Sequence, residues 1–255
     1  MKKKKLLVSC VLHNVHPVAY GSQMSAIYRI GKYLPDWELI FHSPVRRPID
    51  SARNEAAQYA LELECDYLFF FDDDMLPHPD VVRRLLERMN DDTHIVMARC
   101  YIRGWPFHPM IFNYKDLEAT TKEKITVLGH YTEEEYKPNV REDGLVKVDA
   151  VGCASTMIDV ELFKLMDKPW FLTGAQHTED VYFCMKAKDH VENVGIFMDD
   201  NVECGHLMER PILNERSRKI LLELDEKGLD QVFSPKGKRT QQFNYSNPLL
   251  EGEKS

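Results

Sequence analysis

Three consecutive aspartates, Asp72, Asp73 and Asp74, directly follow the apolar run of residues 67–71. Adjacent carboxylates repel one another, and a divalent cation with oxygen ligands relieves that repulsion most directly. In an extended chain the side chains of Asp72 and Asp74 point one way and that of Asp73 the other. We therefore predict that Asp72 and Asp74 bracket a metal ion, while Asp73 accepts a separate hydrogen bond. A solvated acidic loop that caps the next helix is the competing interpretation.

The aspartates lie at the end of a strand that the sequence predicts to be buried on both faces. Residues 67–74 read YLFFFDDD, and the residues before the aspartates form a continuous apolar run and not an alternating one. Ligands of open α/β sheets bind outside the carboxyl ends of the strands. This position favours a binding site over a solvated loop.

Apolar patterning predicts that strands and helices alternate through the first hundred residues. The expected strands are 6–12, 37–43, 67–74 and 94–103, and the expected helices are 21–34, 50–64 with Asp50 or Ser51 as N-cap, and 76–90 with Pro79 in its first turn. Such alternation is typical of an α/β fold with a Rossmann-like, mostly parallel central sheet and helices on both faces.

The second part of the chain is less regular. Residues 103–146 are polar and predict loops and hairpin strands inserted over one end of the sheet. A strand or strand pair entering a helix follows at 146–166, a helix opened by Thr178 comes next, and a last strand is expected at 194–206. We expect one domain over residues 1–227 and a polar tail over 228–255.

Composition narrows the function classes. The chain has 255 residues, of which 44% are hydrophobic and 29% charged, as in ordinary globular proteins. Its net charge of −8 argues against nucleic-acid binding by the whole surface. The six cysteines are spread singly, which favours a reducing compartment. They form no CxxC pair, which argues against a zinc ribbon. Because the N-terminal apolar stretch is too short for a secretion signal and no stretch could span a membrane, we expect a cytoplasmic protein.

Several motifs together resemble the GT-A fold glycosyltransferases, in particular the family two-like enzymes with a DxD motif. They occur in the expected order, with ARN at 52–54, DDD at 72–74, the segment GCASTMIDVELF at 152–163, TED at 178–180 and GH at 205–206. A DxD motif alone is weak evidence, but the ordered set is much stronger. The resemblance spans residues 5–206 and implies a GT-A-like fold. Residues 1–102 would form the nucleotide-sugar-binding half, and residues 103–227 the acceptor-side half with its insertion.

The resemblance implies a metal-dependent, hexosyltransferase-type enzyme. Such enzymes move a sugar from a donor such as a UDP- or GDP-sugar to a hydroxyl of a glycan, lipid or small-molecule acceptor. By analogy Asp74 would ligate Mn²⁺ or Mg²⁺, while Asp72 would contact the ribose or reach the metal through water. His206 would complete the metal shell, although a histidine satisfied within the core is the competing interpretation.

The pair Glu179 and Asp180 opens a predicted helix, where acidic residues are stabilised by the helix dipole alone. The resemblance implies a further role for the second acid of this pair as the general base that takes the proton of the acceptor hydroxyl. We therefore favour Asp180 over Glu179 as the base and an inverting reaction over a retaining one.

The resemblance also implies donor contacts from Arg53 and Asn54, and a guanidinium suits a phosphate or a paired aspartate. A surface arginine paired on its own helix is the alternative for Arg53. His13 and Asn14 follow the first strand, where this fold holds the nucleotide base, and Asp73 would lie beside the donor.

The acceptor or sugar is expected near Gly152, Cys153 and Trp105. Small residues at a strand end allow close approach to the backbone, and aromatic faces stack on sugars. Tight strand packing and local loop packing are the respective alternatives.

Two other function classes stay open. A sugar-phosphate nucleotidyltransferase shares a related fold, but it carries a glycine-rich loop with a basic residue after the first strand, and residues 13–23, HNVHPVAYGSQ, lack that pattern. A non-catalytic protein that binds nucleotide sugars or carbohydrate is the second alternative. The presence of all the charged motifs argues against this loss of activity.

Overall fold

The computed structural model describes residues 3–13, 16–118, 124–175, 177–208 and 212–226. The chain divides into two units, residues 1–217 and 218–255. The functional residues predicted above all belong to the first unit, and the description that follows concerns that unit.

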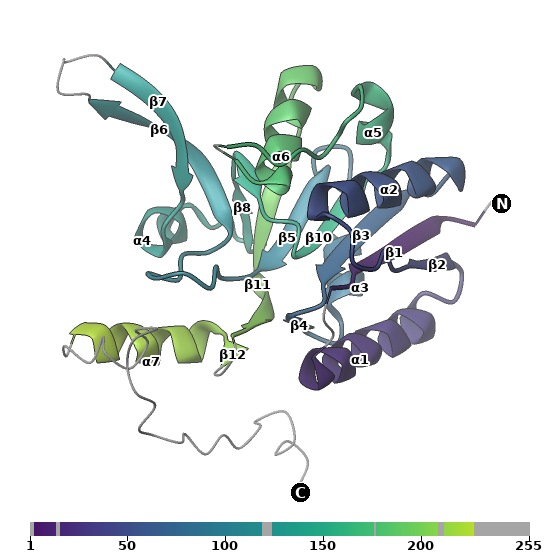
Figure 1. The fold of residues 1–255 in the computed structure, drawn as a ribbon, viewed down its shortest axis with the longest axis horizontal. Coiled ribbons are helices and arrows are strands. Elements are labelled where there is room, and N and C mark those ends of the chain that lie inside the picture. Colours follow the sequence, from purple (N-terminus) through teal and green to yellow (C-terminus); the bar gives the residue numbers. More distant parts are fainter. Residues whose placement is uncertain (1–2, 14–15, 119–123, 176, 209–211, 227–255) are drawn as a thin grey trace, which may run out of the picture. The chain divides into compact units, whose positions relative to one another are not determined.

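A mostly parallel sheet forms the centre of the fold (Figure 1). Its strand order is β2 (Glu38–His42), β1 (Lys5–Val11), β3 (Tyr67–Asp72), β10 (Ser155–Asp159), β5 (Ile95–Arg99), β11 (Ile196–Leu207) and β12 (Ile212–Leu213). β1 pairs in parallel with β2 and β3, and β5 pairs in parallel with β11, while β10 runs antiparallel between β3 and β5. The predicted α/β class is therefore confirmed.

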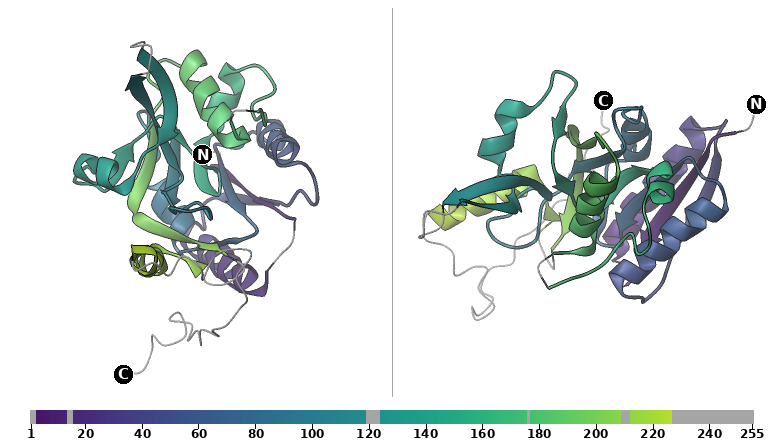
Figure 2. Two further views of the ribbon diagram at one scale, coloured as in Figure 1. Left: turned by 60° about the vertical axis from the view of Figure 1, so that its left-hand side comes forward. Right: turned by 90° about the horizontal axis from the view of Figure 1, so that it is seen from above.

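Helices cover both faces of this sheet (Figures 1 and 2). Among the described residues, these helices are α1 (Pro17–Tyr33), α2 (Ile49–Glu62), α3 (Val81–Leu86), α5 (Glu161–Leu165) and α6 (Glu179–His190). Residues 103–146 contain α4 (Glu133–Tyr136) and the 3₁₀ turn η1 (Lys137–Asn139), and α7 (Glu215–Glu226) begins in the first unit and ends in the second. α1 packs with α3, and α2 packs with α5 and the strands β1 and β3. Small residues permit this close packing, since Ala52, Ala56 and Ala60 of α2 are fully buried.

The predicted insertion contains a hairpin. β6 (Ile111–Glu118) pairs with β7 (Lys124–His130) on one side and with β9 (Ala150–Val151) on the other. In Figure 1 this hairpin extends away from the central sheet. β8 (Leu145–Lys147) instead pairs with β11, so the insertion is joined to the sheet at its base.

Two predicted helix starts are wrong. α2 begins at Ile49 with Pro48 at the N-cap position, so Asp50 and Ser51 lie inside its first turn. α3 begins only at Val81, because Met75–Pro77 form strand β4 and pair antiparallel with β11. Pro79 therefore precedes the helix. The backbone groups of β4 are satisfied by β11, and they are not free to start a helix.

The core lies around β3, as the apolar run predicted. Leu68, Phe69, Phe70 and Phe71 are at most 1% exposed. All six cysteines are free thiols buried in this interior. Within the described ranges, every helix is too short or too polar to cross a lipid bilayer.

Candidate active site

The three aspartates adopt a turn at the carboxyl end of β3. The strand ends at Asp72, and Asp73 and Asp74 reverse the chain into β4. The predicted extended course through Asp74 is therefore wrong. The buried amide of Gln23 on α1 holds this turn by donating to the carbonyl oxygens of Asp72, at 3.0 Å, and Met75, at 3.3 Å.

Asp73 accepts a separate hydrogen bond, as predicted. Its Oδ2 lies 2.6 Å from the backbone nitrogen of His13. This bond ties the segment that follows β1 to the acidic turn. The predicted contact of His13 with a nucleotide base stays a prediction, and Asn14 lies outside the described residues.

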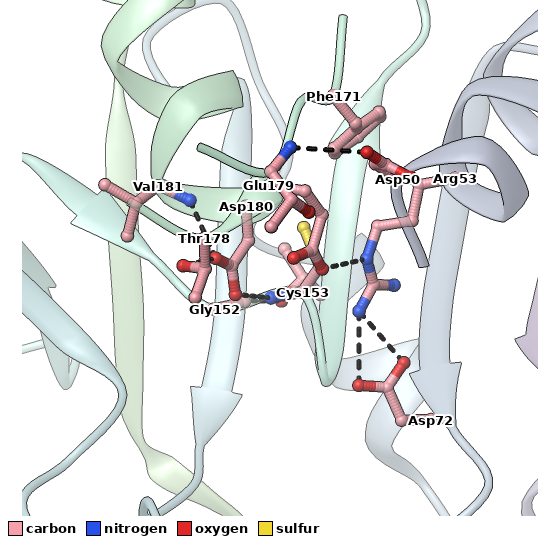
Figure 3. Close-up of polar contacts among 12 residues, drawn as sticks. Asp50, Arg53, Asp72, Gly152, Cys153, Phe171, Thr178, Glu179, Asp180 and Val181 are labelled. Carbon is pink, nitrogen blue, oxygen red and sulfur yellow. Dashed lines mark hydrogen bonds and ion pairs between the residues drawn. The ribbon is translucent and has the colours of Figure 1, made fainter. Parts of the chain in front are cut away.

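Arg53 joins the acidic turn to the start of α6 (Figure 3). Its Nη2 donates to both carboxylate oxygens of Asp72, at 3.0 and 3.1 Å, and its Nε donates to Oε1 of Glu179 at 2.9 Å. The side chain is 2% exposed, and it lies over the ring of Phe70. The alternative of a surface arginine paired on its own helix is therefore wrong.

The pKa values of Asp72 and Arg53 are both raised, by opposing effects of burial and charge. Burial raises the pKa of Asp72 to about 6, with Asp74 and Glu179 adding to the rise and Arg53 opposing it. Burial also works against the charged guanidinium, but the carboxylates outweigh it and raise the pKa of Arg53. The Nη1 atom of Arg53 is buried and has no hydrogen-bond partner among the described residues.

Asp74 points to a different partner, His206 on β11. Nε2 of His206 lies 3.2 Å from Oδ2 of Asp74, and Nδ1 lies 2.8 Å from the carbonyl oxygen of Tyr101. Burial opposes ionisation of Asp74, but His206 and Arg103 outweigh burial and lower its pKa. Because a carbonyl can only accept, Nδ1 carries a hydrogen, so Nε2 can donate to Asp74 only when the ring is protonated, and the neutral ring would present a lone pair there.

This pair fits a divalent cation. A lone pair and a carboxylate oxygen at 3.2 Å repel each other unless a proton or a metal ion lies between them. A histidine whose second nitrogen donates to a backbone carbonyl is the usual form of a metal ligand. In the described part of the chain, no group of three His, Cys, Asp or Glu side chains is placed to hold a metal. Asp74 and His206 would thus need substrate or water oxygens to complete a site.

Asp180 lies at the first turn of α6, with its carboxylate turned toward Gly152 and Cys153 (Figure 3). Its Oδ1 accepts from the backbone nitrogen of Val181 at 2.8 Å and from the hydroxyl of Thr178, and its Oδ2 accepts from the backbone nitrogen of Cys153 at 3.3 Å. Thr178 occupies the N-cap position without capping the helix through its side chain. Its hydroxyl orients Asp180 instead.

Gly152 packs closely beside this carboxylate. A Cβ atom there would lie 2.6 Å from Cε of Met110 and 3.4 Å from Oδ2 of Asp180. This close packing matches the alternative interpretation of the small residues, and the approach of a sugar or acceptor to Gly152 and Cys153 stays a prediction.

Two predicted residues gain no support from their surroundings. The amide nitrogen of Asn54 donates to the carbonyl oxygens of Asp50 and Phe171, and its oxygen accepts from the backbone nitrogen of Trp170 at 2.9 Å. Asn54 therefore serves to join α2 to the segment before α6. Trp105 is 53% exposed and packs edge-on against Phe107, so its contact with an acceptor stays a prediction.

The comparisons with known proteins agree with this arrangement. Residues 35–158 match the family model described as Glycosyl transferase family 2. The predicted resemblance to GT-A fold, family two-like glycosyltransferases is confirmed. The match covers β2 to β10 and therefore includes Arg53 and the acidic turn. It supports a glycosyltransferase activity for the domain.

Solved structures resemble the GT-A domain at low sequence identity. A crystal structure of A197 from STIV has a TM-score of 0.51 at 17% identity and covers 82% of this chain and 93% of that one. This likeness concerns the fold alone. A crystal structure of GalNAc-T7 with UDP, GalNAc and Mn²⁺ has a TM-score of 0.44 at 13% identity over 81% of this chain, and one of S. aureus TarS 1–349 has 0.41 at 12% over 76%. The chain spans 44% and 60% of those two chains.

The comparison with curated protein sequences found no match. Some residues of the candidate site were not predicted from the sequence. Gln23 holds the acidic turn, Thr178 orients Asp180, and Tyr101 orients His206 through its backbone carbonyl. A threonine immediately before an acidic pair could have indicated the second of these contacts. The other two have no local signal in the sequence.

Proposed function

We propose that this chain is a metal-dependent glycosyltransferase that moves a sugar from a nucleoside-diphosphate sugar to an acceptor hydroxyl with inversion, and that Asp180 is the general base. The observation that carries the proposal is that Glu179 and Asp180 have different hydrogen-bond partners. Glu179 pairs with Arg53, whereas Oδ2 of Asp180 lies beside Gly152 and accepts a long hydrogen bond from the nitrogen of Cys153, at 3.3 Å.

In the proposed reaction the acceptor oxygen attacks the anomeric carbon of the donor, and the bond from that carbon to the diphosphate oxygen breaks. The proton of the acceptor hydroxyl passes to Oδ2 of Asp180. Oδ1 accepts from Thr178 and from the nitrogen of Val181, whereas Oδ2 accepts the longer bond from the nitrogen of Cys153, so Oδ2 would be the oxygen that takes the proton. A carboxylate held in this way contributes about 10²–10⁴-fold as a general base.

The donor would bind at the carboxyl ends of β1 and β3. A Mn²⁺ or Mg²⁺ ion held by Asp74 and His206 would neutralise charge on the departing diphosphate. Asp72, paired with Arg53, would lie beside the ribose or reach the metal through water. The buried, unpartnered Nη1 of Arg53 is a donor suited to an anionic oxygen.

The test is the substitution Asp180→Asn, with Asp189→Asn as a matched control. Asp189 carries the same carboxylate at the exposed end of the same helix. With UDP- and GDP-sugars and Mn²⁺, we expect Asp180→Asn to lower turnover about 10²–10⁴-fold and to leave stabilisation by the nucleoside diphosphate intact. Asp189→Asn should match the wild type. Retained turnover in Asp180→Asn would contradict the assignment of the base.

A second assay separates the alternative enzyme class. Sugar phosphate and nucleoside triphosphate should give no nucleotide sugar with this chain. Formation of a nucleotide sugar would contradict the proposed reaction, even if Asp180 were needed for it.

A further inference from the structure

One face of the sheet β7–β6–β9 leads away from Asp180. In the antiparallel pair of β6 and β9, Phe112 lies opposite Ala150 and Ile111 opposite Val151, which places Met110 opposite Gly152. Opposite residues of such a pair project to the same face, as do residues two apart along a strand. Met110 and Phe112 therefore share the face on which Asp180 lies. Its Oδ2 and the Cε of Met110 are both within 3.4 Å of one point beside Gly152.

Rings continue this face beyond Met110. His130 of β7 lies opposite Phe112, with ring centroids 4.8 Å apart, and the ring of His108 lies 5.1 Å from that of His130. We call His108, Met110, Phe112 and His130 the ring face. All four are partly exposed, whereas Ile111, which projects to the other side, is fully buried.

The ring face carries little charge. Burial, His108 and Lys115 lower the pKa of His130, so its imidazole is neutral at neutral pH. The lysines that flank the face are already paired, Lys188 with Asp149 and Lys115 with Glu135. A phosphate group would therefore find no available lysine at these two positions.

The ring face also carries a buried hydrogen-bonding atom, Nδ1 of His130, without a partner among the described residues. A buried polar atom without a partner is uncommon and calls for a ligand or water. Apolar ring faces with a few directed polar groups are the usual composition of small-molecule sites.

We propose that the ring face is the acceptor subsite and that it selects a neutral sugar ring, whose apolar face stacks on Phe112 and His130 while one hydroxyl reaches Asp180. This inference rests on the proposed transferase function for the role of Asp180. The binding of a sugar to the ring face can be measured independently of that function.

The experiment measures binding of the methyl α- and β-glycosides of glucose, galactose, mannose and N-acetylglucosamine to the full chain. Saturation-transfer NMR is recorded with and without UDP and Mn²⁺. We expect at least one glycoside to bind with its ring protons saturated. Phe112→Leu, which keeps volume but loses the ring, should weaken binding about tenfold. His130→Phe, which keeps a ring but loses the nitrogen, should weaken binding about threefold.

Tyr28→Ala is the matched control, because Tyr28 is an aromatic residue that is 70% exposed on α1. It should leave glycoside binding unchanged, and circular dichroism should show that all three variants are folded. Absence of binding by every glycoside, or binding insensitive to both ring-face variants, would each overturn the inference. Glycoside binding that depends on Phe112, in a chain that binds no nucleotide, would support the ring face while contradicting the proposed transferase.

Discussion

Two buried arginines, Arg53 and Arg99, each lie between carboxylates from different elements, yet their surroundings differ. Arg53 pairs with Asp72 and Glu179. Arg99, at the end of β5, pairs with Asp200 of β11 and Glu215 at the start of α7, both at 2.8 Å. Each guanidinium also has one buried nitrogen without a partner among the described residues. Unpaired atoms therefore do not distinguish the two regions.

The pKa of the aspartate that pairs with each arginine does distinguish them. Asp200 also accepts from the hydroxyl of Tyr136 at 2.9 Å and from Nζ of Lys137 at 2.8 Å. Burial opposes ionisation of Asp200, but Lys137, Arg99 and Tyr136 outweigh it and lower its pKa. Arg99 also lies 3.9 Å from Oε2 of Glu203, so Arg99 and Lys137 face three carboxylates in this cluster.

Around Arg53, the cations Arg53 and Arg103 also face three carboxylates, Asp72, Glu179 and Asp74, but here burial raises the pKa of Asp72 to about 6. A buried carboxylate with a raised pKa costs free energy in its ionised form. Such a cluster is typical of a site that is completed by a cationic or hydrogen-bonding ligand. In the Arg99 cluster, in contrast, Lys137, Arg99 and Tyr136 keep Asp200 ionised, which indicates a structural role.

The largest expected difference comes from removing each arginine. Arg53→Met and Arg99→Met should each lower the free energy of unfolding by about 3–5 kcal/mol, because each leaves buried carboxylates without a partner. Only Arg53→Met should also lower turnover per folded molecule, by at least about a hundredfold. Urea unfolding followed by circular dichroism, together with turnover at low denaturant, checks both values. An equal loss of turnover in Arg99→Met would remove the functional distinction between the clusters.

Metal removal should lower thermal stability through the residues near Arg53, Asp74 and His206, and not through the Arg99 cluster. Mn²⁺ and a nucleoside diphosphate at about a hundred times their dissociation constant should stabilise the wild type by about 2.7 kcal/mol. Asp74→Asn or His206→Gln should abolish the metal-dependent part, whereas Glu215→Gln in the Arg99 cluster should retain it. The measurement is the thermal midpoint with and without EDTA. Full metal dependence in both Asp74→Asn and His206→Gln would contradict the proposed site.

The two glutamates offer a smaller and sharper contrast. Glu179→Gln keeps a hydrogen-bond acceptor for Arg53 but loses the charge, so α6 should hold Asp180 less firmly and kcat should fall about tenfold, or about 1.4 kcal/mol in barrier. The donor KM and the pH dependence of kcat should be unchanged, because Asp180 stays the base. Glu215→Gln should leave kcat unchanged. A loss in Glu179→Gln as large as that in Asp180→Asn would make Glu179 the base.

The sequence predicted the parts of this site that depend on local pattern. The buried strand before Asp72 and the helix that begins at Glu179 follow from runs of a few residues, and both are present. The pairing of Arg53 with Glu179 joins residues 126 positions apart, and the family resemblance supplied no partner for it. His206 is oriented by a backbone carbonyl, which every residue possesses. Long-range pairing and backbone partners leave no signature in residue type.

The smallest expected effect concerns Lys137, whose side chain is 38% exposed. Lys137→Met should lower the free energy of unfolding by less than about 1 kcal/mol at pH 7, because exposed pairs are screened by solvent. The lowered pKa of Asp200 means that its ionised form stabilises the fold above its unfolded value of about 3.9, and that this contribution is lost as pH falls through the lower, folded value. Without Lys137 the folded pKa moves back up toward the unfolded one. The urea midpoint of Lys137→Met should therefore change less steeply below about pH 4 than that of the wild type. An unchanged acid dependence would mean that Arg99 and Tyr136 alone lower the pKa of Asp200, without a contribution from the exposed Lys137.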